Sequence, residues 1–267
     1  MKVLRSHDNP QVRRWRRLMR DRRMRRREAR ALIEGPHLVE AFLERGGVPV
    51  ALLASERALG RGDVATLVAR TRLSPVVLSD EVFGAIADTE SPAGVAAEIP
   101  VPPERFELKT SQACVFLEGI QDMGNLGAIL RSAAAFEVHD VVLARGCADA
   151  WAPKTLRAGM GAHFTLRILQ TEDLAAAMER FTGRLVCAVA HGGSALAGVD
   201  LSGRIGFVFG AEGQGVSAET VARADTQVTI PLGAGVESLN VAAAAAICLY
   251  ERVRQLRTGA SRSGARA

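Results

Sequence analysis

The chain has 267 residues, 48% of them apolar, and its 34 Lys and Arg outnumber its 29 Asp and Glu for a net charge of +5. This length and this apolar content exclude a disordered chain and predict one large or two modest globular domains. The four cysteines form no CxxC pair, and the longest uncharged stretch near the C-terminus, residues 238–250, is too short to cross a bilayer. The sequence therefore predicts a cytoplasmic protein with reduced thiols, no metal site and no membrane segment.

The positive charge is concentrated at the N-terminus. Residues 1–30 carry 13 Lys or Arg against three acidic residues, a formal charge of +10, whereas the other 237 residues carry −5. The pair Asn9-Pro10 predicts the start of a helix, and apolar residues recur along it at helical spacing: Val12, Trp15, Leu18 and Met19. Residues 1–30 therefore form a predicted basic helical segment.

Arginine on the remaining faces of this segment matches the shape of a phosphate, and counterion release favours binding to a polyanion. We expect the segment to bind RNA through Arg13, Arg14, Arg16, Arg17, Arg20, Arg22, Arg23 and Arg26. A nuclear signal or contact with an acidic membrane would have a similar composition, but the apolar stripe is narrow for a membrane-binding helix.

Residues 31–99 alternate between strand and helix patterns, as expected of a small α/β domain. The predicted strands are residues 31–35, 48–55, 74–79 and 93–99. The predicted helices are residues 37–46, 62–71 and 80–89. Residues 100–111 place three prolines among charged residues and predict a linker.

A second alternation covers residues 112–256, and the tail at 257–267 is predicted to be flexible. The predicted strands are residues 113–120, 140–145, 184–190, 205–210 and 227–232. The predicted helices are residues 121–136, 154–164, 217–224 and 238–256. Such alternation predicts an α/β domain with a mostly parallel sheet.

Glycine-bearing turns follow three of these strands: "DMGNLGAILR", "FGAEGQG" and "IPLGAGVESLN". The second lacks the Lys and Ser/Thr of a phosphate-binding P-loop, and no GxGxxG fingerprint is present. Glu212 in this turn would repel a phosphate, so it suits a neutral or cationic ligand; a carboxylate that complements a helix dipole is the alternative. Ser238 is a plausible cap of the last helix. Because ligands of open α/β sheets bind at the carboxyl ends of strands, the three turns predict one site.

In order and spacing, "NLGAILRSAAAF", "FVFGAEGQGVS" and "IPLGAGVESLNVAAAAAICLYE" resemble the three motifs of the SpoU/TrmH family of RNA 2′-O-ribose methyltransferases. The stretches "SHDNPQVRRWRRL", "LIEGPHLVEAF" and "DTESPAGVAAEI" resemble the family's L30e-like substrate-binding domain. The resemblance implies a deep trefoil knot in the C-terminal domain, a smaller N-terminal L30e-like α/β domain, and a homodimer.

The resemblance also implies S-adenosylmethionine as cofactor, bound by Gly210, Glu212, Gly213, Ile230, Leu232 and Leu239. The implied catalytic residues are Asn125, Arg131, Glu212, Ser238 and Asn240. A guanidinium stays protonated, so we expect Arg131 to stabilise the developing alkoxide or to hold the adjacent phosphate; a surface ion pair on the helix is the alternative. Lys154 and Arg157 match RNA-binding positions, whereas Gly159 stands where the family has a serine.

The predicted function is methyl transfer to a ribose 2′-hydroxyl of structured RNA, with ribosomal RNA favoured over tRNA. A non-catalytic RNA-binding protein on the same scaffold is a second hypothesis. A nicotinamide-dependent oxidoreductase is a third, disfavoured by the missing GxGxxG fingerprint. Five scattered histidines are expected to be structural or exposed, and the alanines at 242–246 suit close helix packing, either within the domain or in a dimer.

Overall fold

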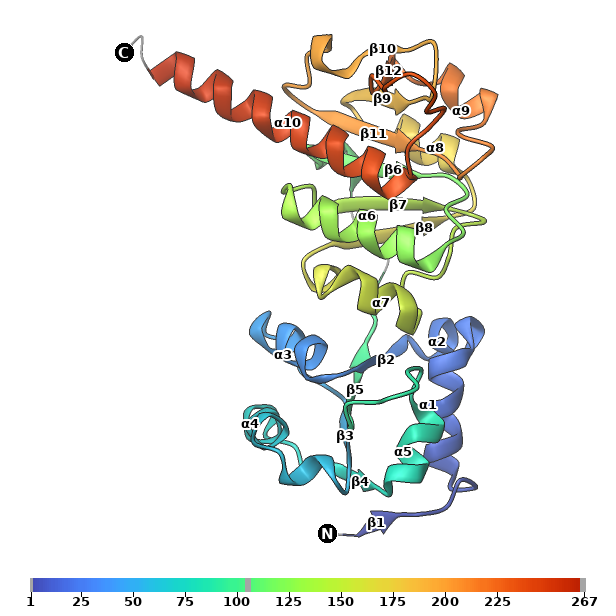
Figure 1. Ribbon diagram of the computed structural model, residues 1–267, viewed down its shortest axis with the longest axis vertical. Helices are drawn as coiled ribbons and strands as arrows, with labels where there is room; N and C mark the ends of the chain where they lie inside the picture. The colour runs from blue at the N-terminus through green and yellow to red at the C-terminus, as the bar shows by residue number, and fades with distance from the viewer. Residues whose placement is uncertain (1, 104–106, 265–267) are drawn as a thin grey trace. The chain divides into compact units, whose positions relative to one another are not determined.

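The computed structural model describes residues 2–103 and 107–264, with side chains described as far as residue 258. Contacts divide the chain into two compact units: residues 1–103 together with 149–164 form unit 1, and residues 104–148 together with 165–267 form unit 2 (Figure 1). The predicted linker and tail fall partly on residues 104–106 and 265–267, which lie outside the described residues.

Unit 1 is built on a mixed sheet that, among the described residues, has five strands. In sheet order these are β1 (Val3–Leu4), β4 (Val76–Leu78), β3 (Ala51–Ser55), β5 (Val95–Pro100) and β2 (Arg30–Glu34). The first three are mutually parallel, and β5 runs antiparallel to both of its neighbours. The four strands predicted between residues 31 and 99 are all present, and the two-residue β1 is an addition.

Helices cover both faces of this sheet (Figure 1). They are α1 (Pro10–Arg20), α2 (Arg22–Glu28), α3 (Pro36–Glu44), α4 (Gly62–Thr71) and α5 (Asp80–Ile86). The predicted N-terminal helix is interrupted because Asp21 is extended (φ −115°, ψ 110°) and its carboxylate caps α2. The predicted apolar stripe, Val12, Trp15, Leu18 and Met19, is buried against α5 and the sheet.

A buried carboxylate fastens α1 to the sheet. Glu98 on β5 accepts hydrogen bonds from both terminal nitrogens of Arg14, each 2.8 Å long, and from the indole N–H of Trp15, also 2.8 Å. Arg14 also pairs with Glu28, 2.6 Å away. Burial raises the pKa of Glu98, but the hydrogen bonds from Arg14 and Trp15 outweigh it and hold the pKa below its ordinary value.

Residues 149–164 belong to unit 1, although the strands on either side of them in the chain belong to unit 2. They form α7 (Pro153–Gly159) and a short 3-10 turn, Ala162–Phe164. The continuous helix predicted for residues 154–164 is wrong, because Met160 and Gly161 take left-handed backbone angles of φ 47° and 87°. Within this unit, buried Arg25 of α2 forms an ion pair with Asp149 at 2.6 Å. His163 of the 3-10 turn is also buried, and its burial lowers its pKa to about 4.

Unit 2 contains a wholly parallel sheet with seven strands among the described residues. In sheet order these are β10 (Ser194–Ala195), β12 (Thr226–Thr229), β9 (Arg184–Ala188), β11 (Ile205–Phe209), β6 (Ala113–Leu117), β7 (Asp140–Ala144) and β8 (Arg167–Thr171). The predicted parallel-sheet α/β domain is confirmed. Strands β8 and β10 and the short helix at Leu174–Glu179 were not predicted from the sequence.

Helices also cover this sheet (Figure 1). They are α6 (Met123–Ala135), α8 (Leu174–Glu179), α9 (Ala218–Ala222) and α10 (Val241–Gly264). α6 packs against α10, while α8 shares a buried core with β6, β7 and β9. The predicted tail starts as helix, because α10 continues to Gly264. None of the helices in the described parts of the chain combines the length and apolar character that crossing a bilayer would take. The trefoil knot stays a prediction.

Candidate active site

A cavity of about 390 Å³ lies at the carboxyl ends of three neighbouring strands of unit 2, β12, β9 and β11. Residues from four chain segments line it: 188–190 at the end of β9, 209–215 at the end of β11, 228–232 in and after β12, and 238–244 at the start of α10. All six residues predicted to bind the cofactor are in its lining: Gly210, Glu212, Gly213, Ile230, Leu232 and Leu239.

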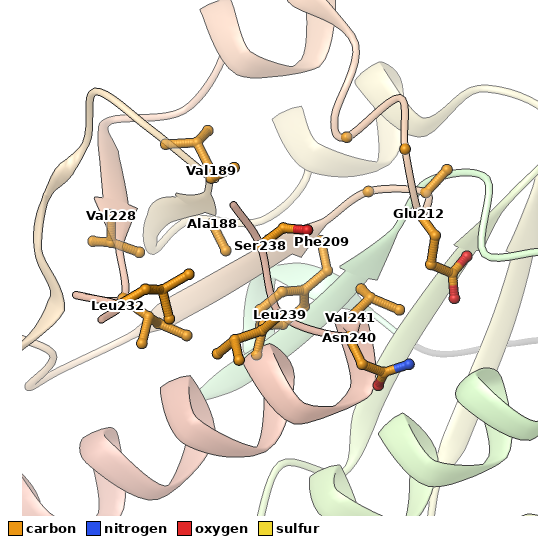
Figure 2. Close-up of a pocket in the computed structure, with 17 residues that line it drawn as sticks. Ala188, Val189, Phe209, Glu212, Val228, Leu232, Ser238, Leu239, Asn240 and Val241 are labelled. Atoms are coloured by element: carbon orange, nitrogen blue, oxygen red, sulfur yellow. The ribbon is translucent and has the colours of Figure 1, made fainter. Parts of the chain in front are cut away.

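The cavity is apolar at one end and polar at the other. In Figure 2, Val228 and Leu232 lie at one end, the Glu212 carboxylate and the Asn240 amide lie at the opposite end, and Leu239 lies between. Ser238 contributes to the wall between them. Such an apolar cavity with a few convergent polar groups is typical of a small-molecule site.

The loop of residues 210–215 is a closed turn that leaves no room for a side chain at its first position, Gly210. Ala211 and Gly215 exchange two backbone hydrogen bonds of 3.1 and 2.9 Å. A Cβ added to Gly210 would lie 2.2 Å from the backbone of Gly215, so any side chain there would open the loop. The closed turn carries Glu212 at its exposed tip.

Three predicted catalytic residues from three different segments meet in one hydrogen-bond chain. The Nδ2 of Asn240 donates to the Oδ1 of Asn125 at 2.9 Å, and the Nδ2 of Asn125 donates to Glu212. The Oδ1 of Asn240 accepts the backbone N–H groups of Ala242 and Ala243. Since that oxygen is already used as an acceptor, the amide nitrogen of Asn240 faces Asn125, and each amide nitrogen in the chain donates one hydrogen bond to an oxygen.

Asn240, not Ser238, caps the last helix. α10 begins at Val241, so the residue before it occupies the capping position and its side chain meets the free N–H groups of the first turn. The prediction of Ser238 as the cap is wrong. Ser238 is exposed and lines the cavity instead.

Arg131 lies apart from this cluster. It is exposed on α6, six residues beyond Asn125, or about 9 Å along the helix axis, and it is not in the cavity lining. Among the described residues, no ion pair or hydrogen bond engages its side chain, so the alternative of a surface ion pair finds no partner there.

The predicted RNA-binding residues fall into two groups. Exposed side chains make up the first: Arg13, Arg17, Arg20, Arg22, Arg23, Arg26 and Lys154. The second group is partly buried. It comprises Arg16, whose side chain makes no polar contact with the described residues, Arg14, held by two carboxylates, and Arg157, 2.7 Å from Asp88.

The contribution of β9 to the cavity was not predicted from the sequence. Ala188, Val189 and Ala190 line the cavity, as do Val228, Val241 and Ala244. These small apolar side chains carry no chemical signature. The usable signal was the end of the predicted strand at residues 184–190, because neighbouring parallel strands end at the same edge of a sheet.

Family models and known relatives match most of the chain. The model of the SpoU rRNA methylase family matches residues 112–250, and that of the MRM3-like substrate binding domain matches residues 9–97. The Bacillus subtilis 23S rRNA (guanosine(2553)-2′-O)-methyltransferase RlmP is 32% identical over 256 residues, which cover 94% of this chain and 98% of the relative. Mouse mitochondrial rRNA methyltransferase 3 is 29% identical, over 90% of this chain and 71% of its own.

Solved structures are similar over nearly the whole chain. The SpoU methyltransferase AviRb from Streptomyces viridochromogenes, in complex with AdoMet, superimposes with a TM-score of 0.84 at 25% identity and covers 92% of this chain and 98% of its own. An AdoMet-bound rRNA methyltransferase from Sinorhizobium meliloti gives a TM-score of 0.82 at 26% identity, with coverage of 96% and 98%. The chain belongs to the SpoU rRNA methylase family.

Proposed function

We propose that the protein transfers a methyl group from S-adenosylmethionine to a ribose 2′-hydroxyl of large-subunit ribosomal RNA. The observation that carries the proposal is the cavity at the ends of β12, β9 and β11, whose lining includes every residue predicted to bind the cofactor. The relatives that act on 23S rRNA favour ribosomal RNA over tRNA as the substrate.

The residues that line the cavity fit S-adenosylmethionine. Leu232, Leu239 and Ile230 offer apolar walls, and the closed loop around Gly210 and Gly213 offers backbone at close range. When bound, the cofactor supplies a methyl group on a positively charged sulfur, and it contains no phosphate. The carboxylate of Glu212 is therefore compatible with this ligand, although it would repel a nucleotide diphosphate.

In this proposal Asn125, Glu212 and Asn240 hold the three loops in one arrangement through their hydrogen-bond chain. Ser238, in the cavity wall, positions the substrate. Arg131 carries a free guanidinium on α6 and stabilises the developing 2′-alkoxide or grips the neighbouring phosphate when RNA is bound. No step requires Arg131 to lose its proton, which a guanidinium does not do in proteins.

RNA binds to the outward-facing arginines of α1 and α2, most of which are exposed. On α1, Arg13, Arg16, Arg17 and Arg20 follow the i, i+3, i+4, i+7 spacing of one helix face, opposite the buried stripe. Lys154 and Arg157 on α7 extend the proposed contact. Arg14 holds α1 on the sheet through Glu98 and is the least available of the predicted set.

A homodimer in the cytoplasm completes the proposal. Ile247 and Tyr250 are exposed apolar side chains three residues apart on α10, which supports a helix face that meets a second copy. All four cysteines lie in the described parts of the chain and are free and buried, as is typical of a reducing compartment.

The test is methyl transfer from labelled S-adenosylmethionine to separate pools of unmodified 23S rRNA, 16S rRNA and tRNA, followed by digestion to nucleosides. We expect label in a 2′-O-methyl nucleoside of the 23S pool. Arg131→Ala should lower kcat by about 10²- to 10³-fold, in the range of a lost oxyanion donor. Arg145→Ala, which removes an exposed guanidinium paired with Glu172, is the matched control. Label in tRNA alone would overturn the substrate assignment, and label elsewhere than the 2′-oxygen would overturn the reaction.

A further inference from the structure

Glu118 directly follows β6 and contacts both ends of the loop that lines the cofactor cavity. Its backbone N–H donates to the carbonyl of Phe209, 2.9 Å away, at the point where β11 passes into the loop. Its carboxylate accepts the backbone N–H of Ser217 at 2.9 Å and the hydroxyl of Thr220 at 3.2 Å, where the loop passes into α9. Glu118 therefore holds the loop of residues 210–216 at both of its ends.

Local contacts support the two hydrogen bonds that Glu118 accepts from Ser217 and Thr220. Ser217 caps α9, accepting the N–H of Thr220 on its hydroxyl oxygen at 3.2 Å. Thr220 is only 6% exposed, so water competes weakly for its hydroxyl. The charge of the carboxylate strengthens both bonds relative to neutral acceptors.

The turn after β6 also touches the loop. Gly119 has φ +69°, and a Cβ added to it would lie 3.3 Å from the Cβ of Ala211. The loop therefore rests on residues 118–119 at its base and reaches Asn125 through Glu212 at its tip. Base and tip are held by successive parts of the same segment, the end of β6 and the start of α6.

We propose that Glu118 is a positioning residue for methyl transfer, which keeps residues 210–216 in the shape that lines the cofactor cavity and presents Glu212 to Asn125. This inference rests on the proposed function. Glu118 does not line the cavity, so its effect on the cofactor passes through the loop.

Calorimetric titration with S-adenosylmethionine and steady-state kinetics on 23S rRNA, with Glu118→Ala, Glu118→Gln and Thr220→Val, test the proposal. Glu118→Ala should raise both the Kd and the KM for the cofactor at least tenfold. Glu118→Gln should recover part of the loss, because its amide oxygen can still accept the Ser217 N–H. Thr220→Val should have a smaller effect in the wild type and none in the Glu118→Ala background. Glu219→Gln, which loses only an exposed pair with Arg223, should behave as wild type.

A merely structural role would lower the folded fraction, and with it the apparent kcat, while the KM and Kd for the cofactor stayed unchanged; that result overturns the proposal. If Glu118→Ala does not fold, Glu118→Gln and Thr220→Val decide the question by the same split between KM and kcat. Wild-type protein that fails to bind S-adenosylmethionine would overturn the proposed function itself. Wild-type binding with equally tight binding by the variants would overturn only the role of Glu118.

Discussion

The arginine-rich helices of unit 1 and the glycine-rich loops of unit 2 use polar residues in opposite ways. Along α1 and α2, one residue type takes two roles according to the face on which it lies: Arg14 and Arg25 point inward to carboxylates, whereas Arg13 and Arg23 point outward. In unit 2, residues up to 115 positions apart in the chain converge on one hydrogen-bond chain. Helices thus distribute neighbouring residues over different faces, and parallel strand ends gather distant ones.

The net charge of a segment is a poor guide to the roles of its individual residues. The N-terminal segment carries +10, yet two of its arginines, Arg14 and Arg25, form ion pairs within the fold. The cavity of unit 2 needs few charges, because amide groups with fixed orientations hold its loops together.

The largest effect is expected where a charge is buried. Glu98→Ala would leave Arg14 and the Trp15 indole without their shared acceptor, so the free energy of unfolding should fall by about 3–5 kcal/mol. Urea denaturation measures this change. Glu56→Ala, which removes a partly exposed pair with Arg5, should cost at most about 1 kcal/mol and serves as the control. Equal costs for the two variants would contradict the inward role of Arg14.

The same pair makes stability depend on pH. Because the pKa of Glu98 is lowered in the folded protein, its stabilisation is fully present above the ordinary value of about 4.3 and is lost as pH falls through the lower folded value. The stability difference between wild type and Glu98→Gln should therefore be constant near neutral pH and shrink below about pH 4. A difference that grew on acidification would have the wrong sign.

The outward arginines should affect RNA binding and leave the fold intact. Arg13, Arg17, Arg23 and Arg26 are exposed and, among the described residues, have no ion pair. Changing all four to Gln should weaken RNA binding and reduce the slope of log K against log salt by about 1 for each lost phosphate contact. Filter binding at several salt concentrations measures the slope. Arg254→Gln, paired with Glu251 on α10, should leave the slope unchanged.

The smallest effect on stability is expected in the loops of unit 2. Asn240→Ala removes the cap of α10 and should cost about 1 kcal/mol of unfolding free energy. Asn240→Asp keeps the capping oxygen but has no N–H for Asn125, so it should retain stability and lose methyl-transfer activity. Thermal unfolding beside the transfer assay separates the two roles. Wild-type activity in Asn240→Asp would mean that the hydrogen-bond chain is dispensable.

Much of the fold was predictable because buried strands and amphipathic helices leave regular apolar patterns. Strand β8 was missed because only Ile168 of its five residues is buried, and an edge strand of this kind shows no apolar run. The break after α7 depends on left-handed backbone at Met160, a conformation that non-glycine residues seldom adopt and that a helical pattern does not reveal.

The cavity residues that belong to sequence motifs were predictable, and the others were not. The three glycine-bearing turns identified Glu212, Leu232 and Leu239, but Ala188 and Val189 have no distinguishing chemistry. Which arginines face inward depends on the carboxylates of Glu98 and Asp149, and these are distant in the chain. Such pairings follow from the tertiary fold and are invisible to local periodicity.

The most direct test of the account is a calorimetric titration of S-adenosylmethionine into wild-type protein, Leu232→Lys and Leu256→Lys. Both variants place a cation at an apolar position, but only Leu232 lines the cavity, while Leu256 is exposed on α10. Losing a buried leucine contact is worth about 1.5–3 kcal/mol, so Leu232→Lys should weaken cofactor binding roughly 10- to 100-fold. Leu256→Lys should bind as the wild type does. Unchanged affinity in Leu232→Lys would show that the cofactor does not bind in this cavity.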